Sequence, residues 1–113
     1  MADHIKITAA ATPVTIAAAG TALGHSSKAL ELKEGSHSAV LYIPRADVDM
    51  SKLERTTRAS TCPWKGKASY YSIRTATGML ENAVWSYEDP LPQMAQIAGH
   101  LAFYPDKVTL TRG

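Results

Sequence analysis

The segment ASYYSIRTATGMLENAVWSY, residues 68–87, is the part of the sequence from which the fold is most directly predicted. Residues 68–75 and 81–87 each alternate side chains between two faces, the period of two that is typical of a half-buried strand. Gly78 lies between the two runs, where a turn would bring them side by side. The sequence therefore predicts a β-hairpin. Within the first run, Tyr71, Ile73 and Thr75 are predicted to share one face of the strand. Within the second run, Ala83, Trp85 and Tyr87 are predicted to share one face.

Shorter runs of the same kind lie on both sides of this hairpin. Residues 14–18 and 29–33 alternate large or branched residues with small or charged ones, as half-buried strands do. Residues 40–43 are apolar on both faces and end at a proline, which indicates a more central strand. A strand through Phe103 and another over residues 107–111 complete the predicted set.

Two short segments read as helices. Ser51 and Glu54 have the spacing of a capping box, which predicts a helix of one or two turns. Residues 92–98 begin with a proline, carry apolar residues at helical spacing and are followed by Gly99, which is suited to end a helix. The predicted fold is a mainly β, compact single domain of short antiparallel strands with two short helices, spanning residues 1–113.

Length and charge restrict the class of protein. A chain of 113 residues is long enough for one hydrophobic core. Its 12 basic and 10 acidic residues give a net charge of +2 and are spread along the chain. A nucleic-acid groove needs clustered positive charge to displace counterions, so we expect no nucleic-acid partner.

The cysteine content and the N-terminal region bear on location. One cysteine cannot form an internal disulfide, which suits a reducing compartment. Residues 7–24 carry no charge, but proline, threonine and glycine interrupt them, so we expect no membrane span. The leading residues MADHIK are not the basic start of a secretion signal. The expected location is the cytoplasm.

Four separated motifs, in order along the chain, resemble one family. They are YIPRADV (42–48), TCPWKGKASYY (61–71), ENAVWSYEDP (81–90) and IAGHLAFYPDKV (97–108). These motifs resemble the bacterial domain of unknown function 427, and the likeness runs over about residues 14–111. The resemblance implies a compact, mainly β domain in which two sheets pack at an angle, like a tent, around a pocket. It implies no established reaction, although the family carries a nucleotidyltransferase-like label.

That label can be compared with the residues. Nucleotidyltransferases of the polymerase-beta type carry a Gly-Ser pair followed by the motif Asp-x-Asp, and the two carboxylates of this motif hold divalent metals. Here Gly35 and Ser36 precede Asp47 and Asp49, which could share a metal if they lay on a strand. The alternative is that both aspartates serve turns and helix caps, because they follow a proline and precede a predicted helix. The second interpretation is favoured.

Cys62 has two interpretations. The positive charge of Lys65 or Lys67 could stabilise its thiolate and make it a nucleophile. A free cysteine is more often a small buried hydrophobe, and burial is the favoured interpretation. Structural zinc sites need four Cys or His ligands, and one cysteine with scattered histidines does not supply a recognisable set. We therefore expect no metal, and no particular cofactor is indicated.

Several side chains combine an aromatic body or a positive charge with a polar tip. Small-molecule sites use aromatic walls and a few convergent polar groups, and arginine or lysine would favour an anionic ligand. The sequence therefore predicts an anion-binding aromatic pocket with basic residues at its rim. The predicted ligand-binding residues are Arg45, Trp64, Lys65, Tyr70, Trp85, Tyr87 and Tyr104.

Catalysis and protein interaction are further hypotheses. If a reaction occurs, His100 is the first choice for a general acid or base because its free pKa lies near neutrality, and Glu81 and Cys62 are the other candidates. Alternatively the domain is a non-catalytic module that forms a homodimer or binds another protein. Trp64, Trp85 and Tyr104 would then anchor an interface.

Overall fold

The computed structural model describes residues 4–113, which form ten strands and three 3-10 helices. All strand pairs are antiparallel, and the strands form three sheets. The first sheet has the order β1 (Ile5–Ala9), β4 (Leu30–Glu34), β5 (Val40–Tyr42). The second has the order β10 (Thr109–Arg112), β2 (Val14–Ala18), β3 (Thr21–Ser26). The third has the order β6 (Leu53–Cys62), β7 (Gly66–Thr75), β8 (Gly78–Ser86), β9 (Ala102–Phe103).

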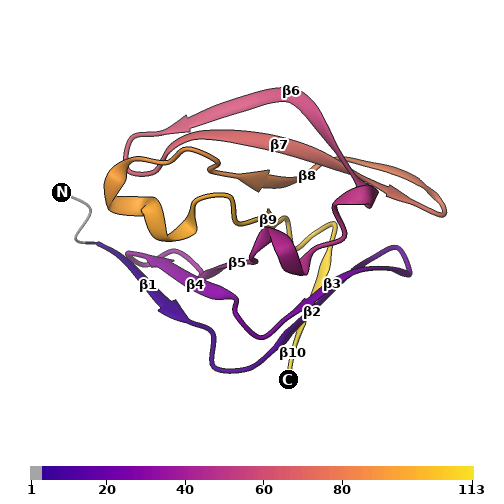
Figure 1. The fold of residues 1–113 in the computed structure, drawn as a ribbon, viewed down its shortest axis with the longest axis horizontal. Coiled ribbons are helices and arrows are strands. Elements are labelled where there is room, and N and C mark those ends of the chain that lie inside the picture. The colour runs from indigo at the N-terminus through magenta and orange to yellow at the C-terminus, as the bar shows by residue number, and fades with distance from the viewer. Residues whose placement is uncertain (1–3) are drawn as a thin grey trace.

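The three sheets enclose the core between them. In Figure 1 the four-stranded sheet lies above, with β1 and β4 below it on the left and β10, β2 and β3 below it on the right. Buried side chains divide into two clusters. The larger contains Val14, Ile16, Ile43 and Ile73, and the smaller contains Tyr42, Tyr70, Tyr87 and Ile97. The mainly β class is therefore confirmed, with three sheets in place of the two implied by the tent-like resemblance.

The hairpin predicted over residues 68–87 is confirmed. Strands β7 and β8 pair with Tyr70 opposite Trp85 and Tyr71 opposite Val84. The register shifts between Tyr71 and Ile73, and Asn82 opposite this bulge has a positive φ of 50°. Because successive residues of a strand point to opposite faces, neighbours in β7 enter different clusters: Tyr70 joins the smaller one and Tyr71 the larger.

The other strands were predicted in part. Strands at 14–18, near 30–34, near 40–42, at Phe103 and near 109–112 form as expected. Strands β1, β3 and β6 were not predicted. Most side chains of β6 are exposed, so its sequence LERTTRASTC has no alternation of apolar and polar residues to mark a strand.

Both predicted helices differ in the structure. The capping box is wrong: Asp49, not Ser51, caps η2 (Met50–Lys52), and β6 begins directly after it. The segment after residue 91 forms the 3-10 helix η3 (Pro92–Ile97) and not an α-helix. It ends before Gly99, whose φ of 72° suits glycine. A third 3-10 turn, η1 (Arg45–Asp47), was not predicted.

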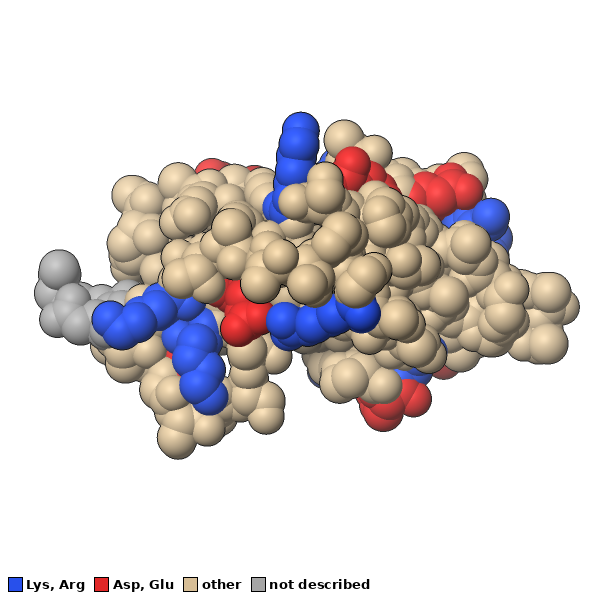
Figure 2. All heavy atoms as spheres, turned by 90° about the horizontal axis from the view of Figure 1, so that it is seen from below, with Lys and Arg blue, Asp and Glu red and all other residues tan. Residues whose placement is uncertain are grey.

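The uncharged segment 7–24 is divided among β1, β2 and β3. Within residues 4–113 no helix has the length and apolar character needed to cross a bilayer. Charges of both signs are mixed on the face in Figure 2, where blue and red side chains are interspersed and form no single field. That distribution agrees with the low net charge of +2. The absence of a nucleic-acid partner remains a prediction.

Candidate functional site

A cavity of about 230 Å³ opens between strands β4 and β5 of the first sheet and the face of β7 and β8. We call it the aromatic cavity. Its aromatic walls are Tyr42, Tyr70, Trp85, Tyr87 and Tyr104. The other walls are Leu32, Glu34, Val40 and Lys65 and the loop residues His37 and Ser38. Two sheets thus contribute to one hollow.

Strand geometry places the aromatic walls. Tyr70 and Trp85 are opposite each other in the β7–β8 ladder, so their side chains lie on the same face of the sheet. Trp85 Nε1 donates to the Tyr42 hydroxyl at 3.4 Å, which links the two sheets. The Trp85 and Tyr104 rings are 4.6 Å apart between centroids. The aromatic side chains therefore support one another as well as line the cavity.

Lys65 enters the cavity from the turn between β6 and β7. Cys62 pairs with Gly66 across this turn, and Gly66 has a φ of 112°, a conformation that suits glycine. The Lys65 carbonyl accepts a hydrogen bond from the Leu91 amide at 2.9 Å. The residue as a whole is 8% exposed, and its Nζ forms an ion pair with Glu34 Oε1 at 2.8 Å.

The Lys65–Glu34 pair sets the charge of the site. The hydrogen bond from Lys65 lowers the pKa of Glu34 in spite of its burial. Burial acts to lower the pKa of Lys65, but the bond to Glu34 and nearby groups outweigh it and raise that pKa. Both groups are therefore charged near neutral pH. Burial also raises the pKa of Tyr42 and Tyr87, which keeps their hydroxyls protonated and able to donate hydrogen bonds.

Polar and charged side chains also surround Tyr70, in another wall of the aromatic cavity. Its hydroxyl lies 2.8 Å from Ser60 Oγ, and the Arg58 guanidinium lies 4.9 Å from the centre of its ring. Burial acts to raise the pKa of Tyr70, but Ser60, Tyr104 and Arg58 together lower it.

The structure brings together five of the seven predicted ligand-binding residues. Lys65, Tyr70, Trp85, Tyr87 and Tyr104 all line the aromatic cavity. Lys65 was expected at the rim and is instead a buried part of the wall.

Trp64 and Arg45 do not line this cavity. Trp64 is 36% exposed and packs edge-on against His4, at 5.0 Å between ring centres. The turn after Cys62 points one of two neighbouring side chains inward and the other outward, and it buries the lysine rather than the tryptophan.

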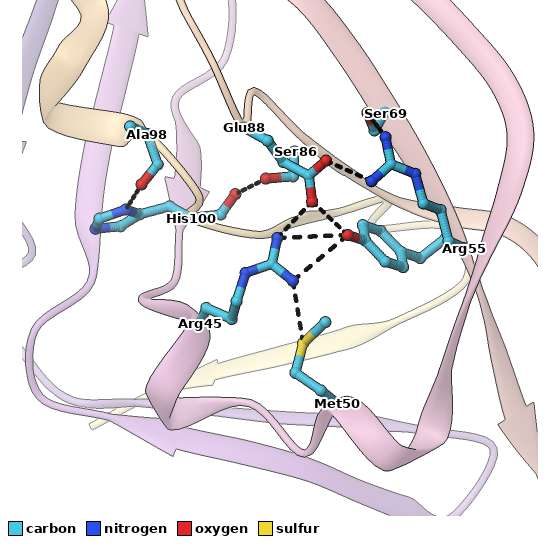
Figure 3. A network of polar contacts seen from close by, with 9 residues as sticks. Arg45, Met50, Arg55, Ser69, Ser86, Glu88, Ala98 and His100 are labelled. Carbon is cyan, nitrogen blue, oxygen red and sulfur yellow. Dashed lines mark hydrogen bonds and ion pairs between the residues drawn. The ribbon is translucent and has the colours of Figure 1, made fainter.

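Arg45 belongs to a separate group that we call the Glu88 cluster. Arg45 Nη2 binds Glu88 Oε2 at 2.8 Å, and Arg55 Nη1 binds Oε1 at 2.9 Å. Figure 3 shows both guanidinium groups turned toward the Glu88 carboxylate. The Tyr71 hydroxyl also donates to Oε2. Burial acts to raise the pKa of Glu88, but Tyr71, Arg55 and Arg45 lower it. The carboxylate joins η1, β6 and β7 and was not predicted.

The three predicted catalytic residues do not converge. His100 Nδ1 lies 3.2 Å from the Ala98 carbonyl, and Figure 3 shows the ring turned away from Glu88. Glu81 lines a different hollow of about 430 Å³, which also includes Arg58 and Lys107. Cys62 is half-buried, with its Sγ 3.6 Å from Lys65 Nζ. The geometry provides no shared reaction centre for these side chains, and their roles remain predictions.

Asp47 and Asp49 both have local partners. Asp47 Oδ2 accepts from the Ser26 hydroxyl at 2.6 Å. Asp49 caps η2: its Oδ1 accepts hydrogen bonds from the hydroxyl and from the amide of Ser51, the latter at 3.1 Å. These two bonds lower the pKa of Asp49. Within residues 4–113 no three His, Cys, Asp or Glu side chains gather as a metal site would require.

Six lining residues of the aromatic cavity were not predicted as site residues, and two of them, Tyr42 and Glu34, make polar contacts with predicted ones. Tyr42 lies in the motif YIPRADV and inside the strand predicted over residues 40–43, but that segment is apolar on both faces and does not show which face borders a cavity. Glu34 carries no signal of its contact, because 31 positions separate it from Lys65.

Comparison with known families identifies the domain. The model of the family described as Domain of unknown function (DUF427) matches residues 6–112, and the chain therefore belongs to that family. The match begins earlier than the residue 14 expected from the motifs. The family's short name contains a nucleotidyltransferase label, but its description gives no activity. A search among curated proteins found no match to the chain.

Proposed function

We propose that this member of the DUF427 family binds a small organic anion with a flat aromatic body in the aromatic cavity. One observation carries the proposal: the Lys65 side chain, 10% exposed, lies on the wall of a cavity whose other walls include five aromatic side chains. Small-molecule sites combine apolar and aromatic walls with a few placed polar groups.

The hydrogen-bond donors favour an anion. An ammonium has three N–H donors. Among residues 4–113 the hydrogen-bond partners of Lys65 Nζ are Glu34 Oε1 at 2.8 Å and Cys62 Sγ at 3.6 Å, and the ammonium lies 5.8 Å from the centre of the Tyr87 ring. A sulfur is a weak acceptor, so a carboxylate or phosphate of a ligand would be a better partner for the same donor. Glu34 has a side chain that is 25% exposed, and it can turn toward solvent when such an anion binds.

The aromatic walls favour a flat ligand body. Trp85 packs against Tyr104 on one side and meets Tyr42 edge-on at 6.4 Å on the other. A ring inserted beside Trp85 would stack on a surface that is already rigid, which lowers the entropy lost on binding. The volume of about 230 Å³ is below that of most sites for drug-sized molecules, so the ligand is small.

The test uses benzoate and phenyl phosphate as probes, with neutral benzamide for comparison. We expect both anions to shift the amide resonances of Tyr42, Tyr70 and Trp85 in a titration followed by NMR. Lys65→Met should weaken binding of the anions at least about tenfold, since a charge-assisted bond contributes more than 1.4 kcal/mol. Lys67→Met, the same change at an exposed position two residues away, should leave binding unaltered.

Glu34→Gln gives the opposite expectation. Removing the competing carboxylate leaves Lys65 without its ion-pair partner, so the anions should bind more tightly and benzamide should not. If no probe shifts cavity residues, or if Lys65→Met and Lys67→Met behave alike, the cavity is not an anion site.

Self-association is the second candidate, because Trp64 and Leu91 are both exposed on neighbouring turns. The Leu91 amide donates to the Lys65 carbonyl at 2.9 Å, which joins the segment of Leu91 to the turn that carries Trp64. Exposed tryptophan next to apolar surface is typical of interface anchors. Sedimentation of the protein and of Trp64→Ala measures this: a dimer lost in the variant supports it, and a monomer in both removes it.

The nucleotidyltransferase hypothesis would use Asp47 and Asp49 to hold a divalent metal. It is supported only by their spacing and by the family's name. Manganese added with a nucleoside triphosphate should broaden the resonances of Ser26 and Ser51, their present partners, if this hypothesis is correct. Broadening that is uniform over the protein would reject it.

A further inference from the structure

We propose that the ligand of the aromatic cavity extends past Trp85 into a second hollow and is therefore an amphipathic organic acid, with an anionic aromatic head and an apolar tail. This inference rests on the proposed function and names the class of ligand. The second hollow, which we call the apolar hollow, has a volume of about 300 Å³. The residues that mark it are Leu41, Phe103, Pro105 and Leu110.

The two spaces meet at a shared wall. Ser38, Val40 and Trp85 line both the aromatic cavity and the apolar hollow. Ser38 is exposed and belongs to the loop before β5, whereas Trp85 extends from β8 in the opposite sheet. The junction thus lies between the Trp85 ring on one side and the loop residue Ser38 with Val40, the first residue of β5, on the other.

The two spaces differ in chemistry in the way that an amphipathic acid requires. The aromatic cavity holds the Lys65–Glu34 ion pair and several tyrosine hydroxyls. Carbon-rich side chains form most of the apolar hollow, and Arg112 at its wall is engaged with Glu31 at 2.8 Å. A charged head therefore finds its partner on one side of Trp85, and a tail finds apolar contacts on the other.

The apolar hollow faces solvent in part. Val40 and Leu110 are half-buried and Pro105 is exposed, so an apolar group placed there removes their surface from water. A space of about 300 Å³ accommodates a short alkyl chain but not a helix or strand of another protein. This size and the three wall residues shared with the aromatic cavity favour the tail of the same ligand as occupant.

The test extends one probe at its far end. Benzoate, 4-ethylbenzoate, 4-butylbenzoate and 4-hexylbenzoate share the head and differ in the tail. Affinity measured by titration calorimetry should rise by about two- to fourfold per methylene until the hollow is filled, because each buried methylene is removed from water. Lys65→Met should weaken every member by a similar factor.

A bulky side chain that fills the apolar hollow should remove the affinity gained from the alkyl tail. It should leave the binding of the benzoate head unchanged. Leu110→Trp should reduce the affinity for 4-butylbenzoate to about that for benzoate, and the affinity for benzoate itself should stay the same. Thr111→Trp, the same bulk on an exposed neighbour in β10, is the matched control and should keep the full gain. Ser38→Trp, at an exposed position, is a second block outside the core; because Ser38 also lines the aromatic cavity, the gain from the tail is measured relative to benzoate in the same variant.

The outcomes separate the two proposals. If benzoate does not bind, the proposed function is wrong. If benzoate binds but longer tails add nothing, or if the gain survives in both Leu110→Trp and Ser38→Trp, the anion site stands and the extension into the apolar hollow is wrong.

Discussion

The aromatic cavity and the Glu88 cluster both contain a carboxylate, basic side chains and tyrosines. They differ in how far these groups are hydrogen-bonded within the protein. In the Glu88 cluster one carboxylate accepts from Arg45, Arg55 and Tyr71, so both of its oxygens are occupied. In the aromatic cavity Glu34 Oε1 binds Lys65 and Oε2 lies 3.5 Å from His4 Nε2, but the Lys65 ammonium borders an open space. One arrangement is complete within the protein, and the other retains donors that a ligand can use.

This difference separates a structural contact from a candidate site. Charge-assisted bonds that are saturated within the protein join strands and turns, as Glu88 joins η1 to β6. A buried ammonium next to a cavity is less well satisfied, because burial removes water that would otherwise surround it. Mutations at the two carboxylates should therefore have different consequences.

The largest effect is expected for Glu34→Gln. It leaves Lys65, with a side chain only 10% exposed, without its carboxylate, and we expect the free energy of unfolding to fall by about 3 kcal/mol. Lys65→Met should be milder, because the Glu34 side chain can reach water. Urea denaturation measures both. The double variant should recover part of the loss, and equal losses in the two single variants would contradict this explanation.

Glu88→Gln should come next, with a loss of about 2 kcal/mol, because bonds to charged groups are weakened while part of the geometry remains. Binding of benzoate should not change, since Glu88 does not line the aromatic cavity. Altered benzoate affinity in this variant would show that the two regions are coupled.

Acidification should weaken both regions. The pKa values of Glu34 and Glu88 are lowered in the folded protein relative to an ordinary value of 4.5, so the unfolded chain binds more protons at low pH. The stability that these two carboxylates contribute is then fully present above about pH 4.5, and it is lost as the pH falls through their folded-state pKa values. The urea midpoint should decrease over that range, and less steeply in Glu88→Gln. Parallel curves would contradict the role of Glu88.

The smallest effect is expected at an exposed ion pair. Arg74 and Glu54 lie 3.2 Å apart with side chains 50% and 56% exposed. Solvent screens such pairs, so Glu54→Gln should change the free energy of unfolding by no more than about 0.5 kcal/mol. A loss comparable with that of Glu88→Gln would mean that burial does not explain the contrast between the regions.

The sequence predicted the parts of the site that depend on local periodicity. Alternation in β7 and β8 follows from the pleat of a strand, and it placed Tyr70 and Trp85 in the predicted hairpin. The motifs also indicated the family that the match over residues 6–112 confirmed. Where a strand is exposed on most positions, as β6 is, no such pattern exists and the prediction failed.

The sequence by itself determined the mainly β class, the hairpin over residues 68–87 and the family. Only the tertiary structure decided that Lys65 is buried and Trp64 exposed, and that Arg45 joins Glu88 rather than the aromatic cavity. The physical reason is that alternation is a property of neighbouring residues, whereas an ion pair such as Lys65–Glu34 depends on how separate sheets pack.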